Sequence, residues 1–326
     1  MLACLLRRMQ QKLGEMGLPV RAALHPTGLY LALRQIGRDE LKDAFMQETI
    51  VRVPAQEKIV HVARHLIGQV PQDTAPIGII FHVSRCGSTL VSQSLKRLDD
   101  LVVYAEPQPV NEILVPPHRW PRAELAGALR TLGVAFARHA GGPYVLKLSS
   151  WNTLYCEMVA EAFPNTPWIL CFRDPVEVGV SLLTRPPGWF SGSGEIARGL
   201  VAQVDPEHAS QSQEEFVARA YGAFCSAAAR LDVRRGLLVP YESLPQAVWH
   251  AVAPHFSLTV DVVERERMAE AARRHAKAPI GTTTEFTSDA AAKQQAASPE
   301  LRQAIDSLAR PQLERLRQLH ADTMQP

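Results

Sequence analysis

The chain has 326 residues, of which 46% are hydrophobic and 21% charged, and its formal net charge is +2 at pH 7. This balance is typical of a globular protein with a sizeable core, and the length favours one large domain with a small appended segment. A charge so near zero excludes the general basic surface of a nucleic-acid-binding protein, so an anionic ligand must meet local basic groups. No stretch approaches the roughly 18 uninterrupted apolar residues of a spanning helix, so we expect no membrane span.

The cysteines and the first residues favour a cytoplasmic location. The cysteines are odd in number, widely spaced and without a CxxC pair, which is typical of reduced thiols rather than of a disulfide framework. At the N-terminus a short apolar run precedes Arg7 and Arg8, the reverse of the order in a secretory signal. The cysteines are Cys4, Cys86, Cys156, Cys171 and Cys225.

Residues 1–75 are predicted to be a small N-terminal accessory segment, because the stretch from 71 to 76, PQDTAP, has the composition of a linker. Mixed helical spacing predicts helices over 36–45 and 58–67, and the apolar residues of 50–53 predict a short strand. The sequence assigns no chemistry to this segment.

Two histidines in this segment have a spacing that can hold a metal ion. His61 and His65 would lie one turn apart on the predicted helix over 58–67. No nearby carboxylate or cysteine completes a ligand set, so we interpret them as two histidines on an amphipathic helix and expect no metal site.

Residues 76–326 are predicted to form the main domain, in which strands alternate with helices. Near-continuous apolar runs are typical of buried parallel strands, and helix-length segments separate them. The predicted fold class is α/β, a P-loop-like three-layer sandwich around a central parallel sheet, followed by C-terminal helices. The predicted strands are 77–83, 101–104, 144–148, 168–172 and 236–240, and the predicted helices between them are 121–139, 152–163, 175–184, 213–231 and 245–255.

Helix-start signals mark the C-terminal helices. Asp261 with Glu264 forms a capping-box pattern, and Ser298 precedes a proline at a first helical position. The segment 186–194 is rich in proline, glycine and aromatic residues, which favours a loop over a site.

The stretch SRCGST, residues 84–89, separates the first predicted strand of the main domain from a helix. Alignment of Gly87-Ser88-Thr89 with the GK[ST] of a triphosphate loop puts Ser88 at the place of the lysine that contacts the outer phosphates. The other features of an anion loop are present, because Gly87 lets the backbone approach an anion and the helix start favours negative charge. Arg85 and the hydroxyls of Ser88 and Thr89 add donors. The alternative is an ordinary glycine turn before a capped helix.

A second stretch, CFRDPVEVGVSLL over 171–183, decides between these alternatives. A strand ends at Arg173, Asp174 and Pro175 begin a helix, and Ser181 lies eight positions after Arg173. SRCGST followed by FRDPVEVGVS resembles the cofactor-binding pair of the sulfotransferases that use 3'-phosphoadenylyl sulfate (PAPS), of the bacterial type. The resemblance implies that the first loop binds the 5'-phosphosulfate, and that Arg173 and Ser181 bind the 3'-phosphate.

Two later stretches extend the resemblance to about residues 77–320. LLVPYESL over 237–244 is similar to a strand and turn of that family. ARRHAKAPIG over 272–281, followed by Phe286 and Asp289, resembles its late basic segment, which closes over the cofactor in bacterial members. The cofactor-binding residues that the resemblance implies are Arg85, Cys86, Gly87, Ser88, Thr89, Leu90, Arg173, Ser181 and Lys277.

The resemblance implies an enzyme that transfers a sulfuryl group from PAPS to a hydroxyl or amine of an unknown small-molecule, peptide or glycan acceptor, without a metal. Arg85 and Lys147 are the expected catalytic cations. The histidine that cytosolic members have shortly after the lysine is replaced here by Ser149, so Glu106, at a strand end, is the proposed base. His82 is expected to be a packed histidine. Cys86 lies at a helix start beside Arg85, conditions that lower a thiol pKa. The resemblance implies only a backbone N–H role for it, so we do not expect it to be a nucleophile.

Two other functions stay open from the sequence. One is a small-molecule kinase with an unusual phosphate loop, which the missing lysine disfavours, and the other is a non-catalytic nucleotide-binding protein that meets a partner through residues 1–75. The acceptor is expected to bind between the loops 107–120 and 184–212.

Overall fold

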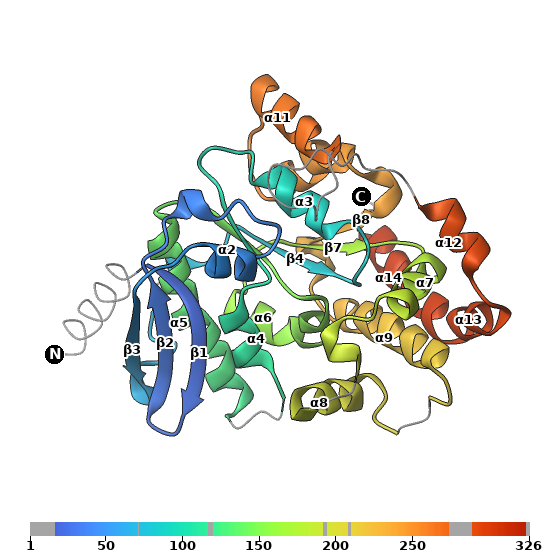
Figure 1. The fold of residues 1–326 in the computed structure, drawn as a ribbon, viewed down its shortest axis with the longest axis horizontal. Helices are drawn as coiled ribbons and strands as arrows, with labels where there is room; N and C mark the ends of the chain where they lie inside the picture. The colour runs from blue at the N-terminus through green and yellow to red at the C-terminus, as the bar shows by residue number, and fades with distance from the viewer. Residues whose placement is uncertain are drawn as a thin grey trace.

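The computed structural model describes residues 17–70, 72–116, 120–191, 194–207, 210–273 and 289–323. It contains a five-stranded parallel sheet flanked by helices and a separate three-stranded antiparallel sheet (Figure 1). The predicted α/β class with a central parallel sheet is therefore confirmed. None of the helices within the described ranges is both long enough and apolar enough to cross a bilayer.

The parallel sheet has the strand order β5-β6-β4-β7-β8. Its inner strands are entirely buried, which is why the sequence shows them as continuous apolar runs. The chain leaves β4 toward one edge of the sheet and leaves β7 toward the other, so a topological switch lies where these two strands pair. The strands are β4 (Gly78–His82), β5 (Val102–Ala105), β6 (Tyr144–Lys147), β7 (Trp168–Phe172) and β8 (Gly236–Pro240).

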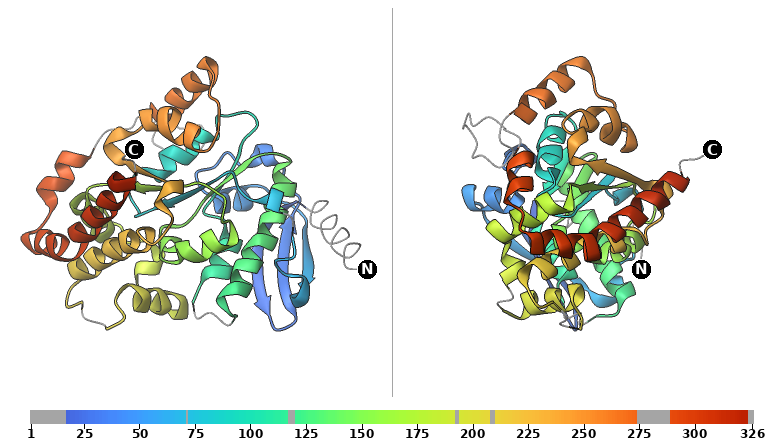
Figure 2. Two further views of the ribbon diagram at one scale, coloured as in Figure 1. Left: turned by 180° about the vertical axis from the view of Figure 1, so that it is seen from behind. Right: turned by 90° about the vertical axis from the view of Figure 1, so that its right-hand side faces the viewer.

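Helices cover both faces of this sheet. Figures 1 and 2 show α3 and α11 on one face, and α5, α6 and α9 on the other. Within the ranges described, the helices of the main domain are α3 (Ser88–Leu95), α4 (Gln108–Leu114), α5 (Arg122–Ala140), α6 (Cys156–Ala162), α7 (Pro175–Thr184), α8 (Gly194–Val204), α9 (Gln213–Ala228), α10 (Ala253–His255), α11 (Val262–Arg273), α12 (Ala290–Ala296), α13 (Pro299–Ala304) and α14 (Arg310–Thr323), with π-helical turns at Val248–Val252 and Ile305–Ala309.

The predicted helix starts are confirmed by their capping bonds. The Asp174 carboxylate accepts from the N–H of Val176 at 2.9 Å, with a proline at the first position of α7. Asp261 and Glu264 form the reciprocal capping box, at 3.0 and 2.7 Å. Ser298 accepts from the first turn of α13 at 3.1 Å. These ends are local in sequence, which is why the sequence predicts them well.

The N-terminal unit, residues 17–70, differs from its prediction. The strands β1 (Leu18–His25), β2 (Gly28–Arg34) and β3 (Glu57–Ala63) form the antiparallel sheet, and α2 (Met46–Arg52) connects β2 to β3. The predicted helix over 58–67 is wrong because Val60 and Val62 are buried on alternate residues, the period of a strand. The predicted strand over 50–53 is wrong because this segment completes α2.

The two histidines of this unit do not share a helix. His61 lies in β3, where its ring stacks on Tyr30 with centroids 4.4 Å apart. His65 follows in a short 3-10 turn, Arg64–Leu66. Among the residues described, no group of three or more His, Cys, Asp or Glu side chains is placed to hold a metal ion.

The N-terminal unit packs onto the main domain. The carboxylate of Glu112 on α4 accepts from the N–H of Ala22 at 2.6 Å, and His139 on α5 hydrogen-bonds the carbonyl of Ile36 at 2.8 Å. The buried side chains of both parts belong to one hydrophobic core. The division of the chain at residue 75 stays a prediction.

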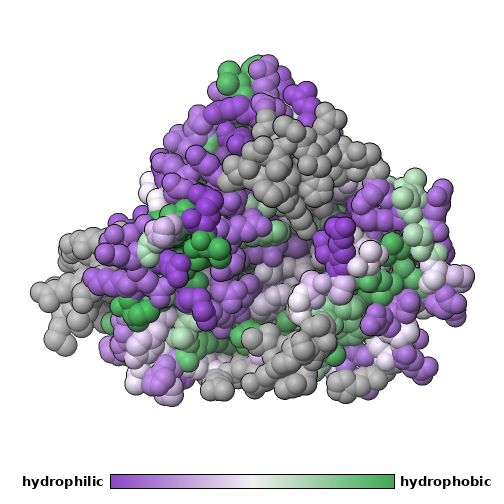
Figure 3. Space-filling model, viewed as in Figure 1, coloured by the Kyte–Doolittle hydropathy of each residue, from purple (hydrophilic) through white to green (hydrophobic). Residues whose placement is uncertain are grey.

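The segment 186–194 begins as the predicted irregular loop and then enters a helix. A 3-10 turn covers Gly188–Ser191, and α8 follows from Gly194. The expected acceptor loop 184–212 therefore contains a helix. Figure 3 shows that hydrophilic side chains cover much of the face seen in Figure 1, with apolar ones in scattered patches.

Candidate functional site

A cavity of about 990 Å³ lies at the carboxyl ends of β4, β6 and β7, where open α/β sheets bind their ligands. Both sequence motifs contribute to it, because one follows β4 and the other follows β7. Lys277 lies outside the described residues. The sequence-predicted site residues that line the cavity are Arg85, Cys86, Gly87, Ser88, Thr89, Leu90, Glu106, Lys147, Arg173 and Ser181.

The loop after β4 has an unusual backbone. Ser84, Arg85 and Gly87 have φ angles of 71°, 51° and 82°, in the left-handed region. Left-handed residues within such a turn can expose backbone N–H groups that favour an anion, although the N–H of Ser84 already donates to His82. A Cβ at Gly87 would lie 2.7 Å from Leu244 and 2.9 Å from the Tyr241 ring, so glycine is required for space as well as for φ.

Arg85 lies at this loop with its guanidinium half buried. It donates to the backbone carbonyl of Arg185 at 2.7 Å. Burial, and then the positive charge of Arg185, lower the pKa of Arg85 from its ordinary value. Arg185 also lines the cavity, and the sequence analysis missed it. Two neighbouring cations at one cavity favour an anionic ligand, even though the Glu106 carboxylate partly compensates Arg85.

Arg173 is almost fully buried at the carboxyl end of β7. Its Nε donates to Glu177 at 2.5 Å, and its Nη2 donates to Asp289 at 2.7 Å. The guanidinium lies 4.0 Å from the centre of the Tyr241 ring. Burial lowers the pKa of Arg173, but the hydrogen bonds to Asp289 and Glu177 together raise it by more. The pKa of Arg173 is therefore above its ordinary value.

Ser181 lies two turns into α7 and faces the same cavity as Arg173. The strand end and helix start between them are held by the Asp174 cap, so their relative position is set by rigid elements. The two residues that the sequence pairs by their spacing, Arg173 and Ser181, therefore both line one cavity.

Glu106, Lys147 and His82 form a cluster at the ends of β5, β6 and β4. The ammonium group of Lys147, which is 1% exposed, donates to Glu106 Oε1. Glu106 has a φ of 53°, an uncommon conformation for a residue with a side chain, and its carboxylate is 27% exposed. The pair puts a proton acceptor and a proton donor side by side in the cavity.

His82 is packed, as the sequence predicts. Its Nδ1 accepts from the N–H of Ser84 at 3.1 Å, so Nε2 carries the proton and donates to the carbonyl of Leu148 at 3.0 Å. Nε2 lies 3.7 Å from Glu106 Oε1. The imidazole therefore holds the loop after β4 against the strand end of β6.

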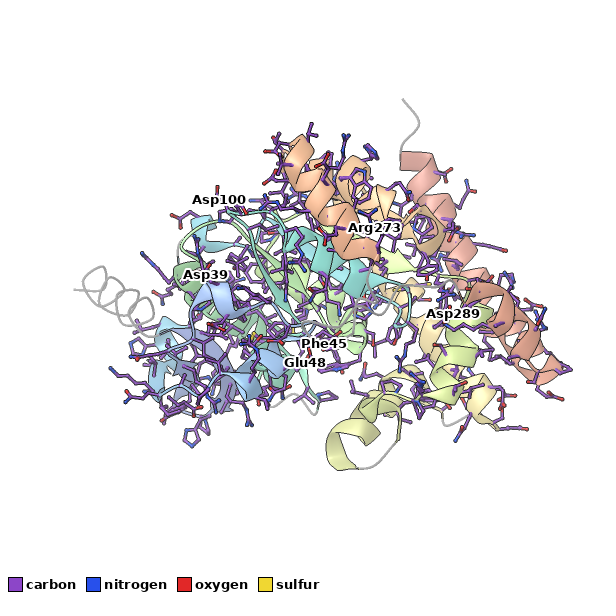
Figure 4. All side chains as sticks on the ribbon, turned by 45° about the horizontal axis from the view of Figure 1, so that its top comes forward. Asp39, Phe45, Glu48, Asp100, Arg273 and Asp289 are labelled. Atoms are coloured by element: carbon purple, nitrogen blue, oxygen red, sulfur yellow. The ribbon has the colours of Figure 1, made fainter. Side chains whose placement is uncertain are left out.

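Two cavity residues that are not among the predicted site residues come from parts of the chain that are far apart in sequence. Phe45, at the start of α2, has its ring 5.1 Å from the Lys147 ammonium. Asp289 precedes α12 and contacts Arg173. Figure 4 shows Phe45 on the side of the N-terminal unit and Asp289 on the side of the C-terminal helices. The N-terminal unit, for which the sequence indicates no chemistry, thus contributes a wall of the cavity.

Cys86 does not have the lowered pKa that its place in the sequence suggests. The side chain is fully buried, and its thiol donates to the carbonyl of Cys171 at 3.1 Å. Burial raises the pKa of Cys86 to about 11, and the backbone N–H groups near it only partly oppose this. Burial therefore outweighs the effect of the helix start, and it disfavours a nucleophilic Cys86, as the sequence analysis does.

We expect Cys86 to resist alkylation in the native protein. With a pKa of about 11, roughly one thiol in a thousand is ionised at pH 8. Peptide mass spectrometry after iodoacetamide treatment at pH 8 should find Cys86 unmodified, and modified when the same reaction contains denaturant. Rapid alkylation of Cys86 in the folded protein would contradict its burial.

The fold and the cavity define an α/β protein with a cavity-lining glycine loop at the switch point of a parallel sheet. No family profile and no curated protein matches the sequence. Its structure is similar to those of bacterial sulfotransferases, at low sequence identity. A sulfotransferase domain of the olefin synthase of Synechococcus PCC 7002 is 14% identical, with a TM-score of 0.44 over 72% of this chain and 94% of that one.

Two further solved structures are similar in the same way. A sulfotransferase from Alicyclobacillus acidocaldarius is 16% identical, with a TM-score of 0.42 over 76% of this chain and 96% of the other. One from Mycobacterium avium is 14% identical, with a TM-score of 0.41 over 74% and 79%. The likeness concerns the course of the chain, so the chemistry has to be argued from the cavity.

Proposed function

We propose that the protein transfers a sulfuryl group from PAPS to a hydroxyl or amine of an acceptor. The observation that carries this proposal is that one cavity is lined by the loop 84–89 with Arg85, by Arg173 with Ser181, and by the Glu106–Lys147 pair. The resemblance of the two motifs to the cofactor-binding pair of PAPS-dependent sulfotransferases supports the same function.

The cavity residues fit the anionic groups of this co-substrate. The loop of 84–89 offers backbone N–H groups, hydroxyls and the Arg85 guanidinium to a phosphosulfate. Arg173 and Ser181 offer a guanidinium and a hydroxyl to a second, separate phosphate. Ser88 stands where a triphosphate loop has lysine, which favours a ligand without a γ-phosphate.

The Glu106–Lys147 pair supports the transfer step. Glu106 accepts the proton of the acceptor hydroxyl as the acceptor oxygen forms its bond to sulfur. The bond between sulfur and the bridging phosphate oxygen breaks, and Lys147 donates a hydrogen bond to that oxygen as negative charge develops on it. Because Lys147 is buried, its charge is little screened by water at this point.

Phe45 supplies an apolar surface beside the reacting pair. Its ring lies next to Lys147, on the side of the N-terminal unit. We propose that the carbon skeleton of the acceptor packs against this ring, which gives the N-terminal unit a role in acceptor binding.

Ligand-induced stabilisation tests the function. We expect adenosine 3',5'-bisphosphate to raise the melting temperature, and AMP, which lacks the 3'-phosphate, to raise it far less. Incubation with labelled PAPS and cell extract should then yield a labelled product. Stabilisation by magnesium-ATP but not by the bisphosphate would instead support a kinase. No shift with the bisphosphate, together with Arg173→Ala behaving like wild type, would overturn the proposal.

A further inference from the structure

Asp289 and Lys293 form a charged pair that belongs to α12 and faces Arg173. One carboxylate oxygen of Asp289 lies 2.7 Å from Arg173 Nη2, and the other lies 2.7 Å from Lys293 Nζ. The carboxylate therefore bridges two cations. Both Asp289 and Lys293 line the cavity that contains the anion loop.

The two members of the pair differ in exposure. The Asp289 side chain is 53% exposed, so its carboxylate can turn toward water with little loss of solvation. The Lys293 side chain is only 15% exposed, and that of Arg173 only 4%. When another anion replaces Asp289 at Arg173, Arg173 and Lys293 both remain at the cavity and can bind that anion.

Contacts other than those of Asp289 also hold α12 in place. The amide of Gln294 donates to Asp174 at 3.0 Å and to Glu177 at 3.3 Å. Arg302 donates in turn to the carbonyl of Gln294. These bonds hold α12 against α7, so a change at Asp289 leaves the helix near the cavity.

We infer that the Asp289 carboxylate competes with a phosphate group for Arg173, and that Lys293 is a further binding residue for that phosphate. This inference rests on the proposed function. A carboxylate and a phosphate on the same face of Arg173 repel each other, so the phosphate binds only as Asp289 leaves. A nucleotide without that phosphate has nothing with which to displace Asp289, so the pair selects ligands that carry it.

The inference predicts effects of opposite sign at the two ends of one ion pair. Asp289→Asn removes the competing charge, and we expect it to tighten binding of adenosine 3',5'-bisphosphate about threefold to tenfold. Lys293→Gln removes a cation that the phosphate contacts, and should weaken binding by a similar factor. AMP affinity should stay within about twofold in both variants. Isothermal titration calorimetry measures all of these constants.

Two controls separate this effect from a loss of structure. Asp306 and Arg310 form an ion pair of the same spacing, at 2.8 Å, on the adjoining helical segment. Neither residue lines the cavity, so Asp306→Asn should leave the bisphosphate affinity unchanged. Lys293→Arg keeps the charge, and should bind the bisphosphate more tightly than Lys293→Gln does. If Lys293→Gln proves unstable, Lys293→Arg can be compared with the wild-type protein instead.

The outcomes distinguish the inference from the proposed function. If wild type binds the bisphosphate but Asp289→Asn binds it equally or more weakly, competition by Asp289 is refuted while the function stands. Unchanged binding by Lys293→Gln refutes the role of Lys293. Bisphosphate binding that is absent from the wild-type protein refutes both the function and this inference.

Discussion

Glu106→Gln is expected to lower the rate of sulfuryl transfer by about 10²- to 10⁴-fold, while the affinity for adenosine 3',5'-bisphosphate changes by less than about threefold. Glutamine keeps the shape of the side chain and an oxygen that accepts from Lys147, but it cannot take a proton from the acceptor. The phosphate-binding residues are on other elements, after β4 and β7. Single-turnover rates with PAPS and an identified acceptor, together with calorimetric binding of the bisphosphate, measure the two effects.

A surface carboxylate provides the matched control for this variant. Glu161 pairs with Arg122 at 2.9 Å, away from the cavity, so Glu161→Gln should keep the wild-type rate. If Glu106→Gln also kept that rate, the base would lie elsewhere. Ser149 would then be the next cavity residue to test, because both ring nitrogens of His82 are engaged with the backbone.

Arg173→Ala is expected to weaken binding of adenosine 3',5'-bisphosphate by about 100-fold or more, with little change for AMP. A hydrogen bond to a charged group contributes about 1.5–3 kcal/mol, and a guanidinium can donate two to one phosphate. Arg173→Lys keeps the charge but loses the fork of donors, so an intermediate affinity is expected.

Arg173→Ala should also lower the free energy of unfolding of the protein. Glu177 is 11% exposed and would lose its cationic partner, which typically costs about 3 kcal/mol for a buried pair. Ser181→Ala supplies a variant without this loss, and should weaken bisphosphate binding about threefold to tenfold. If Arg173→Ala and Ser181→Ala both bound the bisphosphate with wild-type affinity, the proposed second phosphate site in the cavity would be contradicted.

Much of the main domain could be predicted from the sequence because its signals are local. The buried strand β7 and the partly buried strand β8 have the predicted bounds, since each is a short apolar run between polar turns. The start of α7 follows from Asp174 and Pro175, whose capping geometry involves only the next few residues. The local pattern gave a wrong prediction in the N-terminal unit, because only two positions of β3 are buried and they show the strand period too weakly.

The candidate site was predictable only where a motif spans a few residues. Arg85, Arg173 and Ser181 were found because their motifs include the strand end and the helix start that place them. Phe45 belongs to no motif, and nothing in its neighbouring residues distinguishes it from an ordinary apolar residue. Asp289 lies in the late segment that resembles the family, but no motif indicates its contact with Arg173, which depends on an element far away in the sequence.

The sequence by itself determined the parallel α/β domain, the glycine-containing loop after β4 and the arginine–serine interval after β7. Only the tertiary structure decided that the Glu106–Lys147 pair lies in the same cavity, that Phe45 covers Lys147 and that Asp289 binds Arg173. It also decided the state of the Cys86 thiol, because burial depends on the whole surrounding core. Periodicity and capping act over one or two turns of chain, whereas burial and ion pairing depend on segments that meet only when the chain folds.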